Sequence, residues 1–187
     1  MSGLLFVCLA NRARSPLAEL MTRALLDQAP GGSQIAVSSA GTWTPGGEPM
    51  WPPAAAEATR LGLDPTGFRS RQLTPDIADD VDVVLAATRD LRDKLISGQP
   101  SLLRRCFTWR ELAWNLAAAP PAWDGVAWAD RLGALPEVVA RSRGRIPAPP
   151  ADALDVEDPG GRRPKVLREA SAQTLDAVRT ITAALSG

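Results

Sequence analysis

The segment from Leu4 to Glu19 constrains the fold of this chain more than any other stretch. It begins with a short apolar run, Leu4 to Cys8, that is typical of a buried β-strand. Its second half opens with Ser15-Pro16, a pair that favours a helix start, because a serine side chain accepts hydrogen bonds from free amides and a proline needs no amide donor. The segment therefore predicts a strand, a short loop and a helix, with Cys8 at the end of the strand.

The predicted loop has the composition of an anion-binding site. Five residues separate Cys8 from Arg14, which gives the spacing Cys-x5-Arg-Ser. The N–H groups of such a loop surround a tetrahedral anion, the helix N-terminus adds partial positive charge, and a guanidinium binds two oxygens. The same groups stabilise a cysteine as its thiolate, the nucleophilic form. The alternative is structural, with Cys8 as a small buried residue at a strand end.

Residues 6–19 resemble the phosphate-binding loop of the low-molecular-weight protein-tyrosine phosphatases, whose pattern is Val-Cys-x-Gly-Asn-x-Cys-Arg-Ser-Pro-x-Ala-Glu. Ala10 replaces the family's glycine, which requires that its backbone angles suit an L-residue. Ala13 replaces the family's second cysteine. Because that cysteine traps the oxidised nucleophile as a reversible disulfide in the family, we expect this chain to lack such protection.

The resemblance assigns roles to the loop and to a later turn. It implies that Cys8 is the nucleophile, that Arg14 holds phosphoryl oxygens and that the Ser15 hydroxyl helps the sulfur to leave. Residues 38–42 resemble a family turn whose serine braces the loop, which gives Ser39 that role with Asn11 and Ser15; an ordinary turn serine is the alternative. The predicted phosphate-binding residues are Leu9, Ala10, Asn11, Arg12, Ala13, Arg14 and Ser15.

A general acid is predicted near the end of the chain. Residues 155–159 resemble the family's Asp-Pro loop, which assigns the general acid to Asp158, with Asp155 in reserve. The chemistry needs such a group, because the leaving oxygen of a phosphate ester departs poorly unless it is protonated. The chain contains no histidine, so a Ser-His-Asp or Cys-His mechanism and a His-ligated metal site are excluded.

The aromatic wall of the substrate slot is less well defined by the sequence. The family usually has aromatic residues after Asp-Pro, whereas this chain has Gly160 and Gly161. The Gly/Pro-rich loop 43–53 offers two candidates for a wall, Trp43 as the better positional match and Trp51 as the second. Tryptophans in such loops also cover the edges of a core.

The order of elements predicts an α/β fold. Apolar runs alternate with helical patterns, which favours a parallel sheet with helices on both faces, and ligands then bind beyond the carboxyl ends of the strands. We expect a three-layer sandwich, a single domain over residues 1–187, with a central four-stranded parallel sheet and a helical insertion over residues 109–150 before the general-acid loop. Within this insertion we expect one or two extra helices, over residues 110–117 and 127–141. The predicted strands are 4–8, 34–38, 81–86 and 103–108.

Composition limits the partners and the compartment. The chain has 21 basic and 21 acidic residues, so its net charge of zero gives no support for a nucleic-acid or anionic-membrane partner. Two distant cysteines make no disulfide framework, and no apolar stretch is long enough to span a bilayer. A cytoplasmic location follows as an expectation. The oligomeric state is not predicted.

The resulting hypothesis is a cysteine-dependent phosphomonoester hydrolase, most simply a protein-tyrosine phosphatase, that forms a phosphocysteine and needs no metal or organic cofactor. Its substrate is a phosphotyrosine protein or a small phosphorylated metabolite. Two alternatives remain open. One is a phosphate-binding module without catalysis. The other is a thiol-dependent arsenate reductase, which needs two more cysteines close together to relay the disulfide, whereas the chain offers only the distant Cys106.

Overall fold

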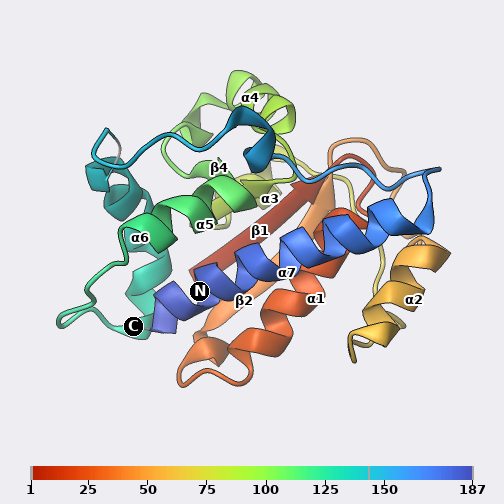
Figure 1. The fold of residues 1–187 in the computed structure, drawn as a ribbon, viewed down its shortest axis with the longest axis horizontal. Helices are drawn as coiled ribbons and strands as arrows, with labels where there is room; N and C mark the ends of the chain where they lie inside the picture. Colours follow the sequence, from red (N-terminus) through yellow and green to blue (C-terminus); the bar gives the residue numbers. More distant parts are fainter. Residues whose placement is uncertain (1, 143, 187) are drawn as a thin grey trace.

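A four-stranded, fully parallel sheet forms the centre of the computed structural model, which describes residues 2–142 and 144–186 (Figure 1). The strands lie in the order β2-β1-β3-β4, so the N-terminal strand is central. The predicted α/β class and parallel sheet are therefore confirmed. The strands are β1 (Ser2–Cys8), β2 (Ile35–Gly41), β3 (Val83–Ala86) and β4 (Cys106–Thr108).

Helices cover both faces of the sheet and make the three layers. The helices α3 and α4 pack on one face, while the longer C-terminal helix α7 crosses the other face beside α1 and α5 (Figure 1). The helices are α1 (Arg14–Leu26), α2 (Pro52–Arg60), α3 (Pro75–Asp79), α4 (Arg89–Gly98), α5 (Trp109–Ala118), α6 (Trp128–Ser142) and α7 (Pro164–Ser186). Three short 3-10 turns lie at Gly32–Gln34, Pro100–Leu102 and Ala151–Leu154.

Strand β1 is buried on both faces because its side chains alternate between two apolar cores. Phe6 and Cys8 belong to the core under α1 and α7, where the Phe6 ring meets Trp109 edge-on at 5.7 Å. Leu5 and Val7 belong to the core under α3 and α4. A continuous apolar run therefore suits this position better than the alternation expected of a half-exposed strand.

The carboxyl ends of the strands and the loops that follow them meet at one edge of the sheet. In the register of the sheet, Cys8 pairs with Gly41 and Val7 pairs with Ala86. The segment before α7 returns to the same edge, since the Val156 N–H donates to the Ala87 carbonyl at 2.9 Å. Residues that follow β1, β2 and β3 and the residues around 156 are thus brought together.

Residues 109–150 contain the two predicted helices. The structure has α5 and α6 where helices over 110–117 and 127–141 are predicted. Leu132, Leu135 and Val139 of α6 are at most 1% exposed, so this stretch adds to the core. No helix in the described part of the chain is both long and apolar enough to cross a membrane.

Candidate active site

The loop after Cys8 turns its carbonyl groups outward and leaves its amides free. Three loop carbonyls accept hydrogen bonds of 2.8–3.1 Å from neighbouring backbone amides; the pairs are Thr42 N with Cys8 O, Trp43 N with Leu9 O, and Trp51 N with Arg12 O. Within residues 2–142 and 144–186, the backbone amides of residues 9–15 donate no hydrogen bond. Unpaired N–H groups gathered in a short loop and a first helical turn are the donors that bind a tetrahedral anion.

Close packing under this loop requires a glycine at the end of β2. A Cβ atom on Gly41 would lie 2.8 Å from the Leu9 carbonyl oxygen. The loop itself needs no glycine, because its positive φ angle falls on Asn11 and not on Ala10. Among the described residues, Asn11 is the non-glycine residue with a positive φ, at 51°. The alanine at position 10 therefore meets the condition that the sequence set for it.

The start of α1 differs from the expectation. The helix begins at Arg14 after Ala13, which has no side-chain cap, so the prediction of Ser15 as the capping residue is wrong. The Ser15 hydroxyl instead donates to Cys8 Sγ at 3.0 Å. Without a capping side chain, the first amides of the helix stay available to a ligand.

Asn11 links the loop to β2 and to the segment after α2. Its amide group donates to Ser15 Oγ at 2.9 Å and to Ser39 Oγ at 2.8 Å, and its Oδ1 accepts from the Arg71 N–H at 2.9 Å. Asn11 and Ser15 are fully buried, and Ser39 is 2% exposed. The residues proposed to brace the loop are therefore in direct contact, and these bonds hold Asn11 in its left-handed conformation.

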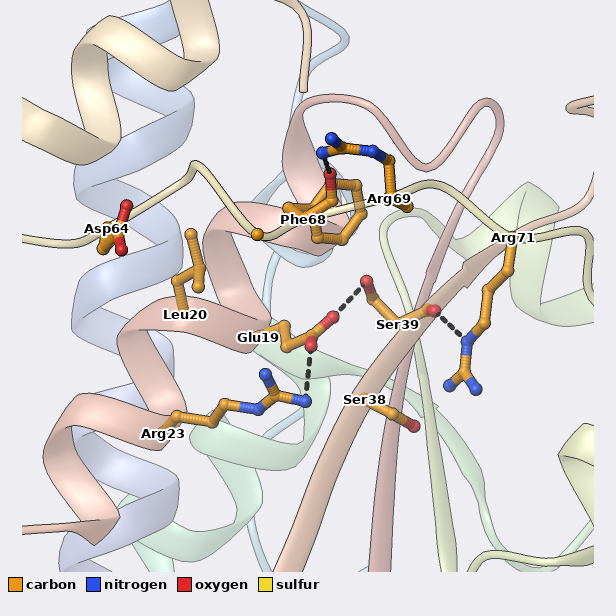
Figure 2. A pocket seen from close by; sticks show the side chains of 10 residues that line it. Glu19, Leu20, Arg23, Ser38, Ser39, Asp64, Phe68, Arg69 and Arg71 are labelled. Atoms are coloured by element: carbon orange, nitrogen blue, oxygen red, sulfur yellow. Dashed lines mark hydrogen bonds and ion pairs between the residues drawn. The ribbon is translucent and has the colours of Figure 1, made fainter. Parts of the chain in front are cut away.

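Glu19 extends this network, and Figure 2 shows its carboxylate between Ser39 and Arg23. Ser39 Oγ donates to Glu19 Oε2 at 2.5 Å, and Arg23 forms an ion pair with Glu19 Oε1 at 2.7 Å. Because Ser39 gives its proton to Glu19, its oxygen accepts from Asn11; Ser15 also accepts from Asn11, and its own proton goes to the Cys8 sulfur. Burial raises the pKa of Glu19, although the Ser39 hydrogen bond and the Arg23 charge oppose this shift.

Sequence reasoning missed Glu19 and Arg71. One signal was present, because Ser15, Glu19 and Arg23 recur every four residues along one side of a helix that packs on the sheet. Arg71 gave no local signal, since it acts through its backbone N–H and through an Nε–H that donates to the Ser39 carbonyl at 2.7 Å. A cavity of about 510 Å³ lies beside these residues, and its lining does not include Cys8.

We expect an Asn11→Ala variant to lose about 2 kcal/mol of folding free energy, because it leaves two buried hydroxyls and an amide with fewer partners. Its turnover of an aryl phosphate should fall about tenfold, because the loop loses its positioning. Urea unfolding and initial rates measure the two effects. Asn115→Ala is the matched control, since Asn115 is 8% exposed and donates only within α5. It should lose stability and keep its activity; an equal loss of activity would contradict the positioning role.

The Arg14 guanidinium is hydrogen-bonded to the segment around residue 156. One terminal nitrogen donates to the Val156 carbonyl at 3.1 Å, and the other pairs with Asp158 Oδ2 at 2.7 Å. The Arg14 side chain is 9% exposed, whereas that of Asp158 is 50% exposed. One terminal nitrogen of the mostly buried Arg14 guanidinium is therefore paired with a half-exposed carboxylate.

A cavity of about 200 Å³ joins the predicted catalytic residues. Its lining residues are Cys8, Leu9, Ala10, Arg12, Ala13, Arg14, Trp51, Asp158, Gly160 and Gly161. Trp43 is absent from this lining and is 74% exposed. The structure therefore favours Trp51 over Trp43 as the wall residue: both backbone N–H groups bond to the loop, but only Trp51 of the two lines the cavity, and Trp43 is largely exposed.

Asp155, the reserve candidate for the general acid, lies outside this cavity. Its Oδ1 accepts from the Arg89 backbone amide at 2.7 Å, at the start of α4, and its carboxylate pairs with the Arg89 guanidinium. These partners give Asp155 a structural position. Asp158 is the carboxylate of this segment that reaches the cavity above Cys8.

The second cysteine lies far from the first in the fold. Cys8 belongs to the core on one face of the sheet and Cys106 to the core on the other face. Burial raises the pKa of Cys106 to about 12. A disulfide needs Cα atoms within about 7 Å and Cβ atoms that point toward each other. A thiol relay from Cys8 to Cys106, as an arsenate reductase would need, is therefore not favoured.

Taken together, these groups match what phosphoryl transfer from an ester requires. One cavity beside the free amides of the loop is lined by the Cys8 thiol, the Arg14 guanidinium and the Asp158 carboxylate. Transfer of a phosphoryl group depends mainly on positioning and on stabilising charge on three equatorial oxygens. The arrangement is suited to an in-line attack on phosphorus by sulfur.

Comparison with known proteins gives matches of sequence and of structure. A family model described as "Low molecular weight phosphotyrosine protein phosphatase" matches residues 3–112. The protein EpsP of Ralstonia solanacearum, a probable low molecular weight protein-tyrosine-phosphatase, is 31% identical over 109 residues, which are 58% of this chain and 71% of EpsP.

Solved structures show the same fold over nearly the whole chain. A YwlE mutant from Bacillus subtilis matches with a TM-score of 0.72 and 19% identity over 100% of both chains. The tyrosine phosphatase AmsI of Erwinia amylovora gives 0.71 and 18% identity, with 100% of this chain and 94% of AmsI covered. The YwlE arginine phosphatase of Geobacillus stearothermophilus gives 0.69 and 21% identity, with 98% and 92% covered.

Proposed function

The chain belongs to the low molecular weight phosphotyrosine protein phosphatase family and is a cysteine-dependent phosphatase, and on this premise we propose that it hydrolyses phosphotyrosine in proteins with Cys8 as its nucleophile. The single observation that carries the assignment of residues is the common cavity of Cys8, Arg14 and Asp158. The resemblance seen in residues 6–19 is confirmed at the level of the family.

In the proposed first step, the Cys8 thiolate attacks phosphorus in line with the ester oxygen. A sulfur–phosphorus bond forms as the phosphorus–oxygen bond breaks, and the bond pair leaves with the oxygen. Asp158 gives its proton to that oxygen, so the alcohol departs neutral. The free amides of residues 9–15 and the Arg14 guanidinium hold the equatorial oxygens, whose charge rises in the transition state.

In the proposed second step, water hydrolyses the phosphocysteine. Asp158, now a carboxylate, takes a proton from water as the water oxygen bonds to phosphorus and the sulfur leaves as thiolate. The Ser15 hydroxyl, whose oxygen is 3.0 Å from Cys8 Sγ, donates a hydrogen bond to the departing sulfur. Phosphate then leaves, and Asp158 carries the proton that the next turnover needs. The groups used in both steps all belong to this chain.

A protein substrate is proposed over a small phosphorylated metabolite because the mouth of the cavity is open. The lining beyond Asp158 consists of Gly160 and Gly161, which have no side chains to close around a small ligand. Leu9, which also lines this cavity, is 49% exposed. A leaving group that continues into a polypeptide can pass through such an opening.

We expect phosphotyrosine peptides to be hydrolysed with a kcat/KM at least about a hundredfold above those of phosphoserine peptides with the same flanking residues, because a phenolate is the better leaving group and an aromatic ring fills the cavity beside Trp51. Phosphate release from matched peptides measures this ratio. A phosphoarginine peptide and small sugar phosphates complete the panel. Faster hydrolysis of either of these would contradict the proposed substrate and leave the cysteine mechanism intact.

A further inference from the structure

We propose that the cavity beside Glu19 is a docking site for an acidic segment of the substrate protein, an inference that rests on the proposed function. The cavity has a volume of about 510 Å³, within the usual range for ligand pockets, and residues 9–15 do not line it. It lies at the edge of the sheet, because Ser38 and Ser39 of the outer strand β2 contribute to its lining. It is therefore separate from the cavity over Cys8.

Guanidinium groups outnumber carboxylates in the lining of this cavity, three against two. The arginines are Arg23 of α1 and Arg69 and Arg71 of the segment after α2. Figure 2 shows their guanidinium groups on different sides of the Glu19–Ser39 pair. The lining thus has one excess positive charge in a chain whose net charge is zero. This charge favours an anionic ligand.

The two carboxylates of the lining already have donors of their own. Glu19 accepts from the Ser39 hydroxyl and pairs with Arg23 at 2.7 Å. Asp64 accepts from the Thr66 N–H at 2.9 Å and from the Thr66 hydroxyl at 2.7 Å, and these bonds lower the pKa of Asp64. Among the described residues, neither carboxylate forms an ion pair with the two arginines that follow α2.

Arg69 and Arg71 are held by backbone carbonyls and keep donors for a ligand. One terminal nitrogen of Arg69 donates to the carbonyls of Thr66 and Phe68, at 3.1 and 2.6 Å. Arg71 donates through Nε to the Ser39 carbonyl at 2.7 Å. In the part of the chain that the structure describes, nothing accepts from the second terminal nitrogen of Arg69 or from either terminal nitrogen of Arg71. Guanidinium groups that are already ordered bind carboxylates at a lower entropic cost.

The arrangement favours an extended acidic ligand over a single small anion. Each of the three guanidinium groups is held by a different backbone carbonyl, with Arg23 on that of Val37 at 2.7 Å. A segment with several aspartate or glutamate side chains offers a separate carboxylate to each group. Leu20 and Phe68 line the same cavity and provide apolar surface for the methylene groups of such side chains.

The cavity adjoins the loop that follows Cys8. The Arg71 N–H donates to Asn11 Oδ1 at 2.9 Å, and Ser39 Oγ accepts from the Asn11 amide at 2.8 Å. Two residues of the cavity lining therefore contact a residue of the anion-binding loop directly. An acidic segment bound here keeps a neighbouring phosphotyrosine of the same protein close to the nucleophile, which raises its effective concentration there.

The test compares two phosphotyrosine peptides that have the same residues immediately beside the phosphotyrosine. Each carries flanks of about ten residues, which span about 33 Å when extended. The flanks are rich in glutamate in one peptide and in glutamine in the other. The variants are Arg69→Gln and Arg69→Lys, and Arg104→Gln is the matched control. Arg104 is exposed, precedes β4 at the opposite edge of the sheet and does not line the cavity.

We expect the wild type to hydrolyse the glutamate peptide with a kcat/KM at least about fivefold above that of the glutamine peptide, through a lower KM, and to lose this preference at high salt. Arg69→Gln should reduce the preference about two- to fivefold, whereas Arg69→Lys and Arg104→Gln should keep most of it. All three variants should hydrolyse p-nitrophenyl phosphate within about twofold of the wild type. A glutamate peptide without phosphotyrosine should bind the wild type equally well with and without saturating vanadate, an oxyanion that occupies the anion-binding loop.

The outcomes separate this inference from the proposed function. Equal kcat/KM values of the wild type for the two peptides would overturn the docking site and leave the proposed function intact. The same loss of preference in Arg104→Gln as in Arg69→Gln, or loss of glutamate-peptide binding in vanadate, would place the recognition elsewhere and overturn it as well. If the wild type hydrolysed neither peptide, the proposed function would fall and this inference with it.

Discussion

A Cys8→Ser variant is expected to hydrolyse aryl phosphates at least about ten-thousand-fold more slowly than the wild type, because a serine hydroxyl at neutral pH is a far poorer nucleophile than a thiolate. The change replaces sulfur by oxygen and adds no atom to a site that is 3% exposed. The free amides of residues 9–15 and Arg14 remain. Inorganic phosphate should therefore still bind, which calorimetry measures beside the initial rates.

Cys106→Ala is the control for a general effect of losing a cysteine. Cys106 is 2% exposed and lies under the opposite face of the sheet, so its loss leaves a small cavity far from Cys8. We expect a cost of about 1 kcal/mol in folding free energy and an unchanged kcat. Residual activity of Cys8→Ser near that of the wild type would refute Cys8 as the nucleophile. Loss of phosphate binding would show that the anion-binding loop of residues 9–15 had lost its structure.

The part of the site that was predicted from sequence is the part that is continuous in sequence. Cys8, Arg14 and Ser15 lie within eight residues, and a strand followed by a helix leaves such a loop few ways to fold. The alternating order of apolar runs also sufficed for the parallel sheet, because only a parallel sheet with helical crossovers accommodates it. The register of Cys8 with Gly41 then brings Ser39 under the loop, as the resemblance of residues 38–42 to the family turn implied.

The features of the site that could not be predicted from the sequence depend on partners outside the local sequence pattern. Ser15 was expected to cap α1, but the helix already begins at Arg14, and the Ser15 hydroxyl accepts from Asn11 and donates to Cys8 Sγ. Trp43 and Trp51 sit in one irregular loop, where the direction of a side chain follows from single hydrogen bonds and not from a periodic pattern. Arg71 contributes its backbone N–H to Asn11, a role that any residue type except proline can fill.

An Asp158→Asn variant is expected to change two properties in opposite directions. Its kcat should fall about a hundred- to a thousandfold, because asparagine neither protonates the leaving oxygen nor takes a proton from water. Its affinity for inorganic phosphate should rise about three- to tenfold. The Asp158 carboxylate lies 2.7 Å from the Arg14 guanidinium, so it competes with a bound phosphate for that cation, and its negative charge also repels the anion.

The leaving group distinguishes a general acid from a merely structural carboxylate. Because p-nitrophenolate leaves readily without a proton, the first step for p-nitrophenyl phosphate should slow less in Asp158→Asn than that for phenyl phosphate, and single-turnover rates measure the difference. Asp155→Asn is the matched control. It removes the same charge at a position three residues earlier, where the Asp155 carboxylate binds Arg89. That variant should lose stability, keep its phosphate affinity and show no dependence on the leaving group. If Asp155→Asn instead showed the steep dependence and Asp158→Asn did not, the general acid would have to be reassigned to Asp155, and the Arg14–Asp158 pair would be only a structural contact.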